Sequence, residues 1–463
     1  MSTFGAVAFG VVVLALAGCL PTAVLVGLRV VAIPLCPLAG AVLCAASAAS
    51  TVVMPGTMLT WFVGWATAAA VVSVVALMFR PGLASRIGHD LGQESRPLVL
   101  VAGLALAAAV GWALRTVQVP NIGFDTRSIW LLHARWLSHG HSFTLAALRN
   151  HFNVVSHPSY PPLVSSVMAL AWRVSGSGSD RVAVVTVATL NACALFVAGW
   201  GLVEVARRAV VRREGALRTE RRLVALGTLL ATLAVLVAGG VLGAFGTNGY
   251  ADPLWSLAAV AAVISGLVLQ PTTSDLGVVA IVLGVCGLSK VEGTAVAIVL
   301  VLAVSLRRLL QRDRPVGKGV TLTAMGLGVV ALLGWPLLVV FEGITTDANI
   351  SGLRQGSVWL RARATFDAAA PHLHVVVLAA LIGLAGWLFC RDGRRRLGLG
   401  NDLWAWAVLA AATFVLGGAY IFGPGNVELW LSTSVNRTTI FVALLAWWMV
   451  ALWALCGMAE ALE

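Results

Sequence analysis

Long apolar runs separated by short polar intervals make up almost the whole chain. A run of about 20 apolar residues can cross a bilayer as a helix, and a helix satisfies its own backbone hydrogen bonds there. The run VALGTLLATLAVLVAGGVLGAF does not alternate between apolar and polar positions, as a transmembrane β-strand would. The pattern therefore predicts an all-α, polytopic integral membrane protein.

We expect about 13 transmembrane helices, and the N-terminal region allows one or two more or fewer. The predicted spans cover about 4–20, 22–50 (the end of the first helix and a second), 57–79, 97–117, 181–206, 223–245, 253–270, 275–289, 292–306, 319–341, 373–390, 402–422 and 436–457. The first run ends in LAGC at Cys19. No Lys or Arg precedes it and a second apolar run follows at once, so we interpret it as a retained helix.

Composition agrees with this class, because 59% of the residues are hydrophobic and 11% are charged. The net charge of +12 does not indicate a nucleic-acid partner, since the arginines lie in short intervals between helices. Such clusters are typical of cytoplasmic loops. Rich use of Ala, Val, Arg and Trp is typical of a GC-rich bacterial genome. We therefore expect a bacterial cytoplasmic membrane, with the site on the external face.

The segment 161–175 is apolar but has only about 13 residues before Arg173, fewer than a span needs. If it crossed, the interval 207–222 with its seven arginines would lie outside, against the positive-inside rule. We therefore expect 161–175 to be a helix along the external interface. The external first loop then covers 118–180 and contains juxtamembrane helices. A second external loop is expected at 342–371.

Polar side chains that a membrane fold does not need collect at the predicted external face. Ionisable groups near the membrane interior are costly, so they are functional candidates. They are distant in sequence, and we expect the fold to bring them to one face: Asp125, Arg127, His157, Tyr160, Tyr250, Asp252, Lys290, Glu292, Arg354, Arg361, Arg363, Glu428 and Arg437.

Several of these residues also have a purely structural interpretation. Asp125 could cap the helix that follows it, and Asp252 before Pro253 could begin a helix. Lys290 and Glu292 could simply pair with each other. The arginines of 354–363 could be a solvated helical face.

Five of the eight histidines lie between 133 and 157, which raises the question of a metal. The HGH pair lets at most two imidazoles converge locally, and no Cys or second acid completes a tetrahedral set. We predict no metal ligands there. The seven cysteines form no CxxC pair and no disulfide framework.

Four motifs occur in order between 119 and 310: GFDTRSIW, SYPPLVSSVMALAW, GYADPLWSL and GLSKVEGTA. With weaker support from LWLSTSVNRTTIF, the chain resembles the C-type (GT-C) superfamily of membrane glycosyltransferases. It is most similar to the branches of bacterial aminoarabinose transferases and protein O-mannosyltransferases. The resemblance implies a catalytic transmembrane module at 97–463 and additional N-terminal helices at 1–96. As a departure from the family pattern, we expect no large external domain after the last helix.

The resemblance implies transfer of a pentose or hexose from a polyprenyl-phosphate donor to a hydroxyl of a glycan, lipid or protein acceptor, with inversion. Asp125 would be the general base. The donor phosphate would be bound by Lys290, Arg437, Arg354 and Arg127. Sugar or acceptor contacts would come from Asp252, Tyr160, His157, Glu292 and Tyr250. No cofactor is certain, although Asp125 and Asp252 could contribute to a divalent cation.

Two other functions compete with this one. A lipid-linked glycan polymerase, ligase or flippase would also have a large external loop, with Arg and His as working residues. A small-solute transporter would place ionisable residues near the bilayer midplane on broken helices, often with inverted repeats. The charged residues here cluster at one face instead, and no repeat is visible.

Overall fold

The computed structural model describes residues 2–79, 122–211, 217–269, 272–310, 318–346, 356–393, 402–423 and 425–461. Within these ranges every regular element is a helix, which confirms the all-α class. Ten of the described helical segments are long and apolar enough to cross a membrane, the arrangement of a multi-pass membrane protein. The predicted span 97–117 lies outside the described residues, and the total of 13 stays a prediction.

The long helices overlap the predicted spans, although several begin or end at other residues. They are α1 (Thr3–Val26), α2 (Ala32–Val53), α3 (Met58–Phe79), α9 (Asp180–Val211), α10 (Leu217–Leu242), α13 (Val291–Leu310), α14 (Lys318–Phe341), α15 (Val358–Phe389), α17 (Asp402–Phe422) and α19 (Ile440–Ala461). Shorter helices include α11 (Asp252–Val263), α12 (Thr273–Ser289) and α18 (Val427–Thr438). A π-helix, η4 (Ile264–Val268), continues α11, and a 3-10 turn, η3 (Gly243–Gly246), follows α10.

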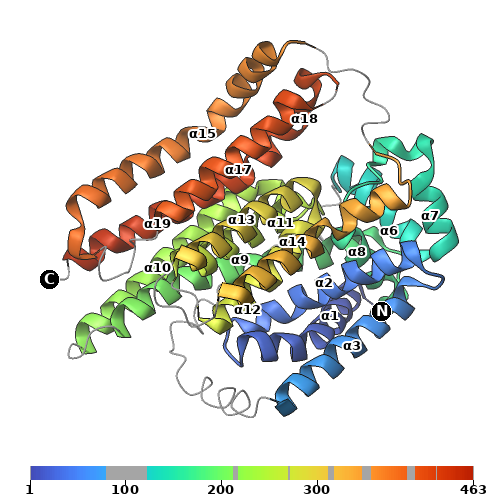
Figure 1. The fold of residues 1–463 in the computed structure, drawn as a ribbon, viewed down its shortest axis with the longest axis horizontal. Helices are drawn as coiled ribbons and strands as arrows, with labels where there is room; N and C mark the ends of the chain where they lie inside the picture. The colour runs from blue at the N-terminus through green and yellow to red at the C-terminus, as the bar shows by residue number, and fades with distance from the viewer. Residues whose placement is uncertain are drawn as a thin grey trace.

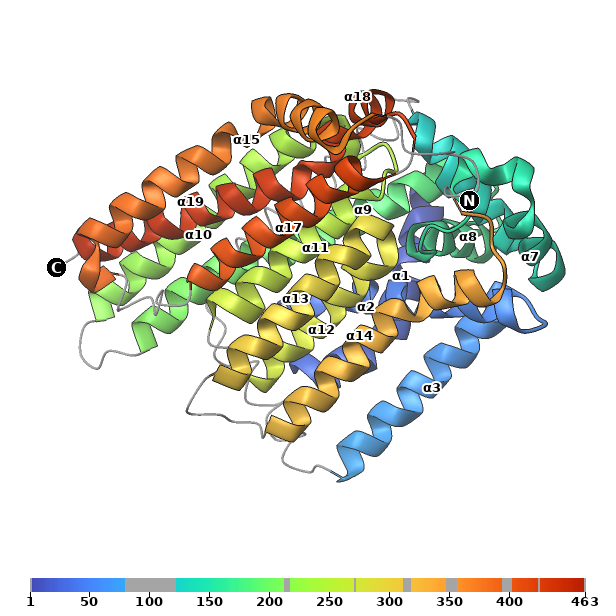
Figure 2. The same cartoon turned by 45° about the horizontal axis from the view of Figure 1, so that its top comes forward.

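The described part of the predicted first loop is folded rather than extended. It contains the π-helix η1 (Thr126–Leu131), α6 (Leu132–Ser138), α7 (His141–Arg149), the 3-10 helix η2 (His151–Ser156) and α8 (Leu163–Ser175). These elements gather with α18 at one end of the bundle, which we call the site end (Figures 1 and 2). The C-terminal end of α19 lies at the other end, called the opposite end.

Helix α8 departs from the expectation of an interfacial helix. Every side chain from Leu163 to Trp172 is buried, because α1, α2, α6 and α9 pack around the helix. A helix lying along the membrane surface would leave one face to lipid. The short apolar segment is therefore inside the protein, where its length need not match the bilayer.

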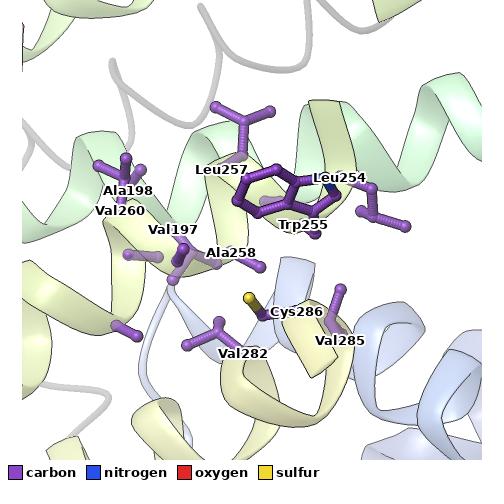
Figure 3. Close-up of a cluster of buried hydrophobic side chains, with 14 of the residues drawn as sticks. Val197, Ala198, Leu254, Trp255, Leu257, Ala258, Val260, Val282, Val285 and Cys286 are labelled. Carbon is purple, nitrogen blue, oxygen red and sulfur yellow. The ribbon is translucent and has the colours of Figure 1, made fainter. Parts of the chain in front are cut away.

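Helix α11 forms the centre of the bundle. All residues of 252–268 are buried, and α9, α12, α13 and α19 pack around them. A helix that is apolar on all sides is typical of such a position. Figure 3 shows side chains of α11, such as Trp255 and Val260, in one buried cluster with side chains of α9 and α12, such as Ala198 and Val282. Asp252 is at one end of α11, and η4 continues the other end. The rigid core around α11 therefore fixes the position of Asp252.

The two N-terminal helices pack into this core. A Cβ at Gly18 would overlap the backbone of α2, and one at Gly40 would overlap that of α1, so glycines allow the close approach. At the turn between the helices, Arg29 pairs with Glu204 of α9 at 3.1 Å and with Asp275 of α12 at 3.2 Å. The N-terminal helices are therefore bonded to the rest of the bundle, whatever their evolutionary origin.

The predicted second external loop is shorter than expected. Helix α15 begins at Val358, where Ser357 caps it by accepting from the Leu360 amide. The prediction that residues up to 371 form a loop is therefore wrong for 358–371. Pro371 lies inside α15.

Candidate functional site

Five of the predicted site residues meet at the site end in one chain of alternating charges, here called the ion-pair chain. Asp125 pairs with Arg437, and Arg437 Nη1 lies 3.8 Å from Asp252 Oδ2. Asp252 Oδ1 accepts a hydrogen bond of 2.8 Å from Lys290 Nζ, which also lies 3.1 Å from Glu292 Oε1. Residues from four separate segments therefore form one electrostatic unit of three carboxylates and two cations.

Asp125 does not cap a helix. It directly precedes η1, but its backbone is already helical and its side chain makes no capping hydrogen bond. The Asp125 carboxylate instead pairs with Arg437, and 24% of the Asp125 side chain is exposed. The capping interpretation is therefore wrong for this residue. Single-turn π-helices such as η1 are rare and frequently occur at functional sites.

Arg437 lies in the last turn of α18 and joins the two aspartates. Its guanidinium carbon is 4.9 Å from the centre of the Tyr250 ring, a cation–π distance. The side chain is 10% exposed, so the ion pairs are largely shielded from water. A planar guanidinium shielded in this way is suited to bind an oxyanion such as phosphate.

Helix α18 is held in place by Tyr420 of α17. The Tyr420 hydroxyl makes 2.8 Å hydrogen bonds to the hydroxyls of Ser434 and Thr438, on either side of Arg437 in sequence. Sequence reasoning missed Tyr420. A signal was present, because the chain has only three tyrosines and the other two were predicted site residues.

Lys290 is the most enclosed cation of the ion-pair chain. It lies between α12 and α13 in extended backbone, and its side chain is 4% exposed. Burial alone would lower the pKa of Lys290, but the carboxylates of Asp252 and Glu292 outweigh burial and raise it. The amine therefore stays protonated. The predicted Lys290–Glu292 pair exists, but it is one link of a longer chain.

Two carboxylate oxygens of the ion-pair chain have unused hydrogen-bonding capacity. Glu292 Oε2 and Asp252 Oδ2 are buried and accept no hydrogen bond from the residues that the structure describes. Asp252 Oδ2 has only the 3.8 Å ion pair with Arg437. Buried acceptors are costly to leave unpaired, so they favour a ligand that donates hydrogen bonds, such as a sugar hydroxyl.

Aromatic rings line the same region. Tyr160 stacks on His157 with ring centres 4.7 Å apart, and Lys290 Nζ lies 6.0 Å from the Tyr160 ring centre. His157 has a left-handed backbone (φ 52°), which is uncommon for a residue other than glycine. On the other side, burial and the nearby Asp125 carboxylate raise the pKa of the Tyr250 phenol, which stays neutral.

A tight contact between two segments fixes the distance from Asp125 to Tyr250. The Thr126 hydroxyl donates a 2.6 Å hydrogen bond to the Asn248 carbonyl. A Cβ at Gly123 would overlap the Tyr250 ring, and Gly249 adopts φ 81° with Thr126 packed against it. The glycines of the GFDT and NGYAD motifs therefore allow these two segments to meet.

The remaining predicted residues do not join the ion-pair chain. Arg127 is exposed, and no described residue pairs it with a carboxylate. Arg354 lies outside the described residues. Arg361 is buried and donates to the carbonyls of Tyr420, Gly423 and Gly425, so it stabilises the C-terminal end of α17.

The histidines of the first loop lie apart. His139 and His141 bond to the backbone carbonyls of Arg135 and Thr51, and His133 stacks on Trp136. Within the described residues no three His, Cys, Asp or Glu side chains group as metal ligands would. Asp125 and Asp252 lie on either side of Arg437, and we predict no divalent cation between them.

A cavity of about 350 Å³ lies between α13, α14 and the segment before α8. Its lining is mainly apolar and includes Ser159, Pro161, Val291, Thr294, Ala295, Ile298, Trp335, Pro336 and Val339. Trp335 donates a 2.8 Å hydrogen bond to the Ser159 carbonyl and fixes one wall. Its lining residues Pro161 and Val291 are sequence neighbours of Tyr160, Lys290 and Glu292, and none of the five residues of the ion-pair chain lines it.

In comparisons with known proteins, no family model, no characterised protein and no solved structure matches this chain. The resemblance to the GT-C superfamily therefore rests on the sequence motifs and stays a hypothesis. The function has to be argued from the geometry of the site end.

Proposed function

We propose that this protein is a membrane glycosyltransferase that moves a sugar from a polyprenyl-phosphate donor to an acceptor hydroxyl at the site end. The ion-pair chain carries the proposal. It joins a partly exposed carboxylate, two enclosed cations and unused carboxylate oxygens, which are the groups that such a transfer needs. Orientation of the arginine-rich loops toward the cytoplasm would place the site end on the external face of a bacterial cytoplasmic membrane.

In the proposed reaction Asp125 takes the proton of the acceptor hydroxyl. The acceptor oxygen attacks the anomeric carbon and forms the new glycosidic bond. The bond from that carbon to the phosphate oxygen breaks, and its electron pair leaves with polyprenyl phosphate. One direct displacement inverts the anomeric configuration.

Arg437 would change partner during binding. In the structure its guanidinium is bound by Asp125 and lies near Asp252. A donor phosphate that replaced Asp125 on Arg437 would release this carboxylate and leave it free to act as a base. Charge builds up on the phosphate as the sugar departs, and Arg437 and Lys290 would stabilise that charge. Arg127, exposed two residues after Asp125, would add a further cation at the entrance.

The polyprenyl tail would occupy the cavity between α13 and α14. Val291 and Thr294 of its wall lie in the first turn of α13, directly after Lys290. A phosphate near Lys290 would thus continue into an apolar space. Glu292 Oε2 and Asp252 Oδ2 would accept hydrogen bonds from sugar hydroxyls.

The test is transfer of radiolabelled sugar from a panel of polyprenyl-phosphate donors by the purified protein in lipid. We expect Asp125→Asn to lower the rate by at least about 100-fold, the usual range for loss of a general base. Asp180→Asn is the matched control, because Asp180 forms an exposed 3.3 Å pair with Arg135 away from the ion-pair chain. The transfer rate of Asp180→Asn should match that of the unaltered protein.

The same panel separates the competing functions. Equal transfer by Asp125→Asn and the unaltered protein would remove Asp125 as the base. Transfer from lipid-diphosphate donors alone would favour a polymerase or ligase. Accumulation of a labelled small solute in vesicles without any transfer product would favour a transporter.

A further inference from the structure

A second apolar groove lies toward the opposite end, between α12, α13 and α14. It has a volume of about 450 Å³ and is here called the α12–α14 groove. Its lining is Leu276, Val279, Ala280, Leu283, Gly284, Val301, Val304, Ser305, Arg308, Thr321, Ala324, Met325, Leu327, Gly328, Ala331 and Leu332. Among the described residues that line it, Arg308 alone is charged. No residue of the ion-pair chain lines this groove, and the proposed reaction does not involve it.

The length of the groove along α14 is close to the thickness of one hydrocarbon leaflet. Along α14 its lining runs from Thr321 to Leu332, about 16 Å at about 1.5 Å per helical residue. One half of a hydrocarbon core of about 30 Å is about 15 Å deep. Neighbouring side chains on the same helices, such as Leu302 and Leu322, are 47% and 48% exposed and form a surface suited to lipid. The dimensions therefore match an acyl chain that lies along the membrane normal.

Arg308 supplies the chemical signal at the polar end of the groove. The residue is 7% exposed, and its Nη1 is buried without a hydrogen-bond partner among the described residues. No described carboxylate pairs with it. Its neighbour Arg307 also has two buried nitrogens without a partner among the described residues, but its Nη1 donates to the carbonyls of Gly266 and Leu269 at the end of η4, and it does not line the groove. A buried guanidinium without an anion is costly, and a bound anion would relieve that cost.

We propose that the α12–α14 groove binds an anionic phospholipid of the leaflet at the opposite end. One acyl chain lies between α12 and α14, and the lipid phosphate accepts hydrogen bonds from Arg308. This lipid is separate from the proposed sugar donor, which binds at the site end. The proposal depends on the groove and on Arg308, and not on the glycosyltransferase activity.

Native mass spectrometry of the full-length protein tests the proposal. Phosphatidylglycerol is added to delipidated protein, and phosphatidylcholine is added in a parallel sample. We expect the unaltered protein to retain phosphatidylglycerol at least tenfold more than Arg308→Gln does. Arg222→Gln is the matched control, since Arg222 is exposed and outside the groove, and it should retain the lipid fully.

A second pair of variants tests the groove without changing its charge. Ala324→Phe fills the groove and should lose phosphatidylglycerol, whereas Leu322→Phe on the same helix lies outside the lining and should keep it. Inorganic phosphate should not displace the lipid, because the acyl chain contributes to binding. Equal retention by Arg308→Gln, equal retention of phosphatidylcholine, or complete displacement by phosphate would each overturn the proposal.

Discussion

Asp125 and Arg437 are separated by 312 positions in the chain, yet they form an ion pair at the site end. Removing charges from water is costly, and many shielded ion pairs do not stabilise a fold relative to apolar residues of similar size. An ion-pair chain of five residues is therefore weak evidence for stability. The proposed function gives a better reason for keeping these charges together, since a donor phosphate would exchange with Asp125 on Arg437.

His133 gives a pH prediction at the same scale. It lies in α6, outside the candidate spans, and burial, with a smaller effect from His157, lowers its pKa to about 3. An unfolded histidine has a pKa near 6.5, so the unfolded state binds a proton below that pH while the folded state does not. The free energy of unfolding therefore decreases as the pH falls below 6.5. We expect the loss to approach about 1.4 kcal/mol per pH unit.

Thermal unfolding in one detergent between pH 7.5 and 5 measures this effect. His133→Phe keeps a flat ring against Trp136 and should reduce the decline of the unfolding midpoint toward acid. His151→Phe is the control, because His151 is exposed, and its pH profile should follow that of the unaltered protein. Identical profiles for His133→Phe and the unaltered protein would contradict the assignment.

At the scale of elements, the site depends on where short segments meet. The turn 246–251 and the start of η1 are joined by Thr126 and Asn248, with glycines where side chains would collide. Helix α18 is likewise fixed through Tyr420. These contacts set the position of the charged residues. Position would matter for the proposed reaction, because misplacement of a catalytic group by about 1 Å can cost about 100-fold in rate.

Gly249→Ala tests this contact. The substitution strains a left-handed backbone (φ 81°) and places a Cβ 2.6 Å from the Thr126 methyl. We expect about 1–3 kcal/mol of destabilisation and a transfer rate at least about tenfold lower, since Asp125 would be displaced. Rates per folded molecule and unfolding midpoints are measured together.

Gly176→Ala is the matched control for backbone strain. Gly176 also has a positive φ (64°), but open space surrounds the position of its missing Cβ. It should lose stability to a similar degree and keep its rate. Equal losses of rate in both variants would mean that strain alone, and not the contact with Thr126, explains the effect.

The whole molecule has an ionic cluster at each end, with the apolar core of α11 between them. At the opposite end the cluster consists of Glu204 with Arg29, Arg207, Arg208 and Asp275, here called the Glu204 cluster. It joins the turn after α1 to α9 and α12. Because it lies far from the ion-pair chain, we expect it to stabilise the assembly of helices without taking part in the reaction.

Glu204→Gln should therefore lower stability by about 3–5 kcal/mol, the usual cost of breaking a buried ion pair and leaving its partners unpaired. Glu204 is 1% exposed and accepts from Arg207 and Arg208 at 2.7–2.8 Å. Asp367→Asn removes an exposed carboxylate 3.8 Å from Arg363 and should cost less than about 1 kcal/mol. Unfolding midpoints in the same detergent compare the two. Similar midpoints would show that the Glu204 cluster contributes little.

The sequence by itself determined the class of the protein and most of its helices. Hydropathy is a local property, so apolar runs located the spans of the described residues without knowledge of their neighbours. The cost of ionisable groups in a membrane then selected Asp125, Asp252, Lys290, Glu292 and Arg437 as candidates. The structure brings these five together.

Only the tertiary structure decided what each residue contacts. The burial of α8 depends on four other helices, and α15 begins at Val358 rather than after residue 371. Arg361 looked like a surface arginine but stabilises the end of α17. Asp125 had the sequence of a helix cap, and its partner Arg437 comes from the far end of the chain. Such pairings depend on the packing of distant helices, and local sequence patterns do not indicate which distant helices pack together.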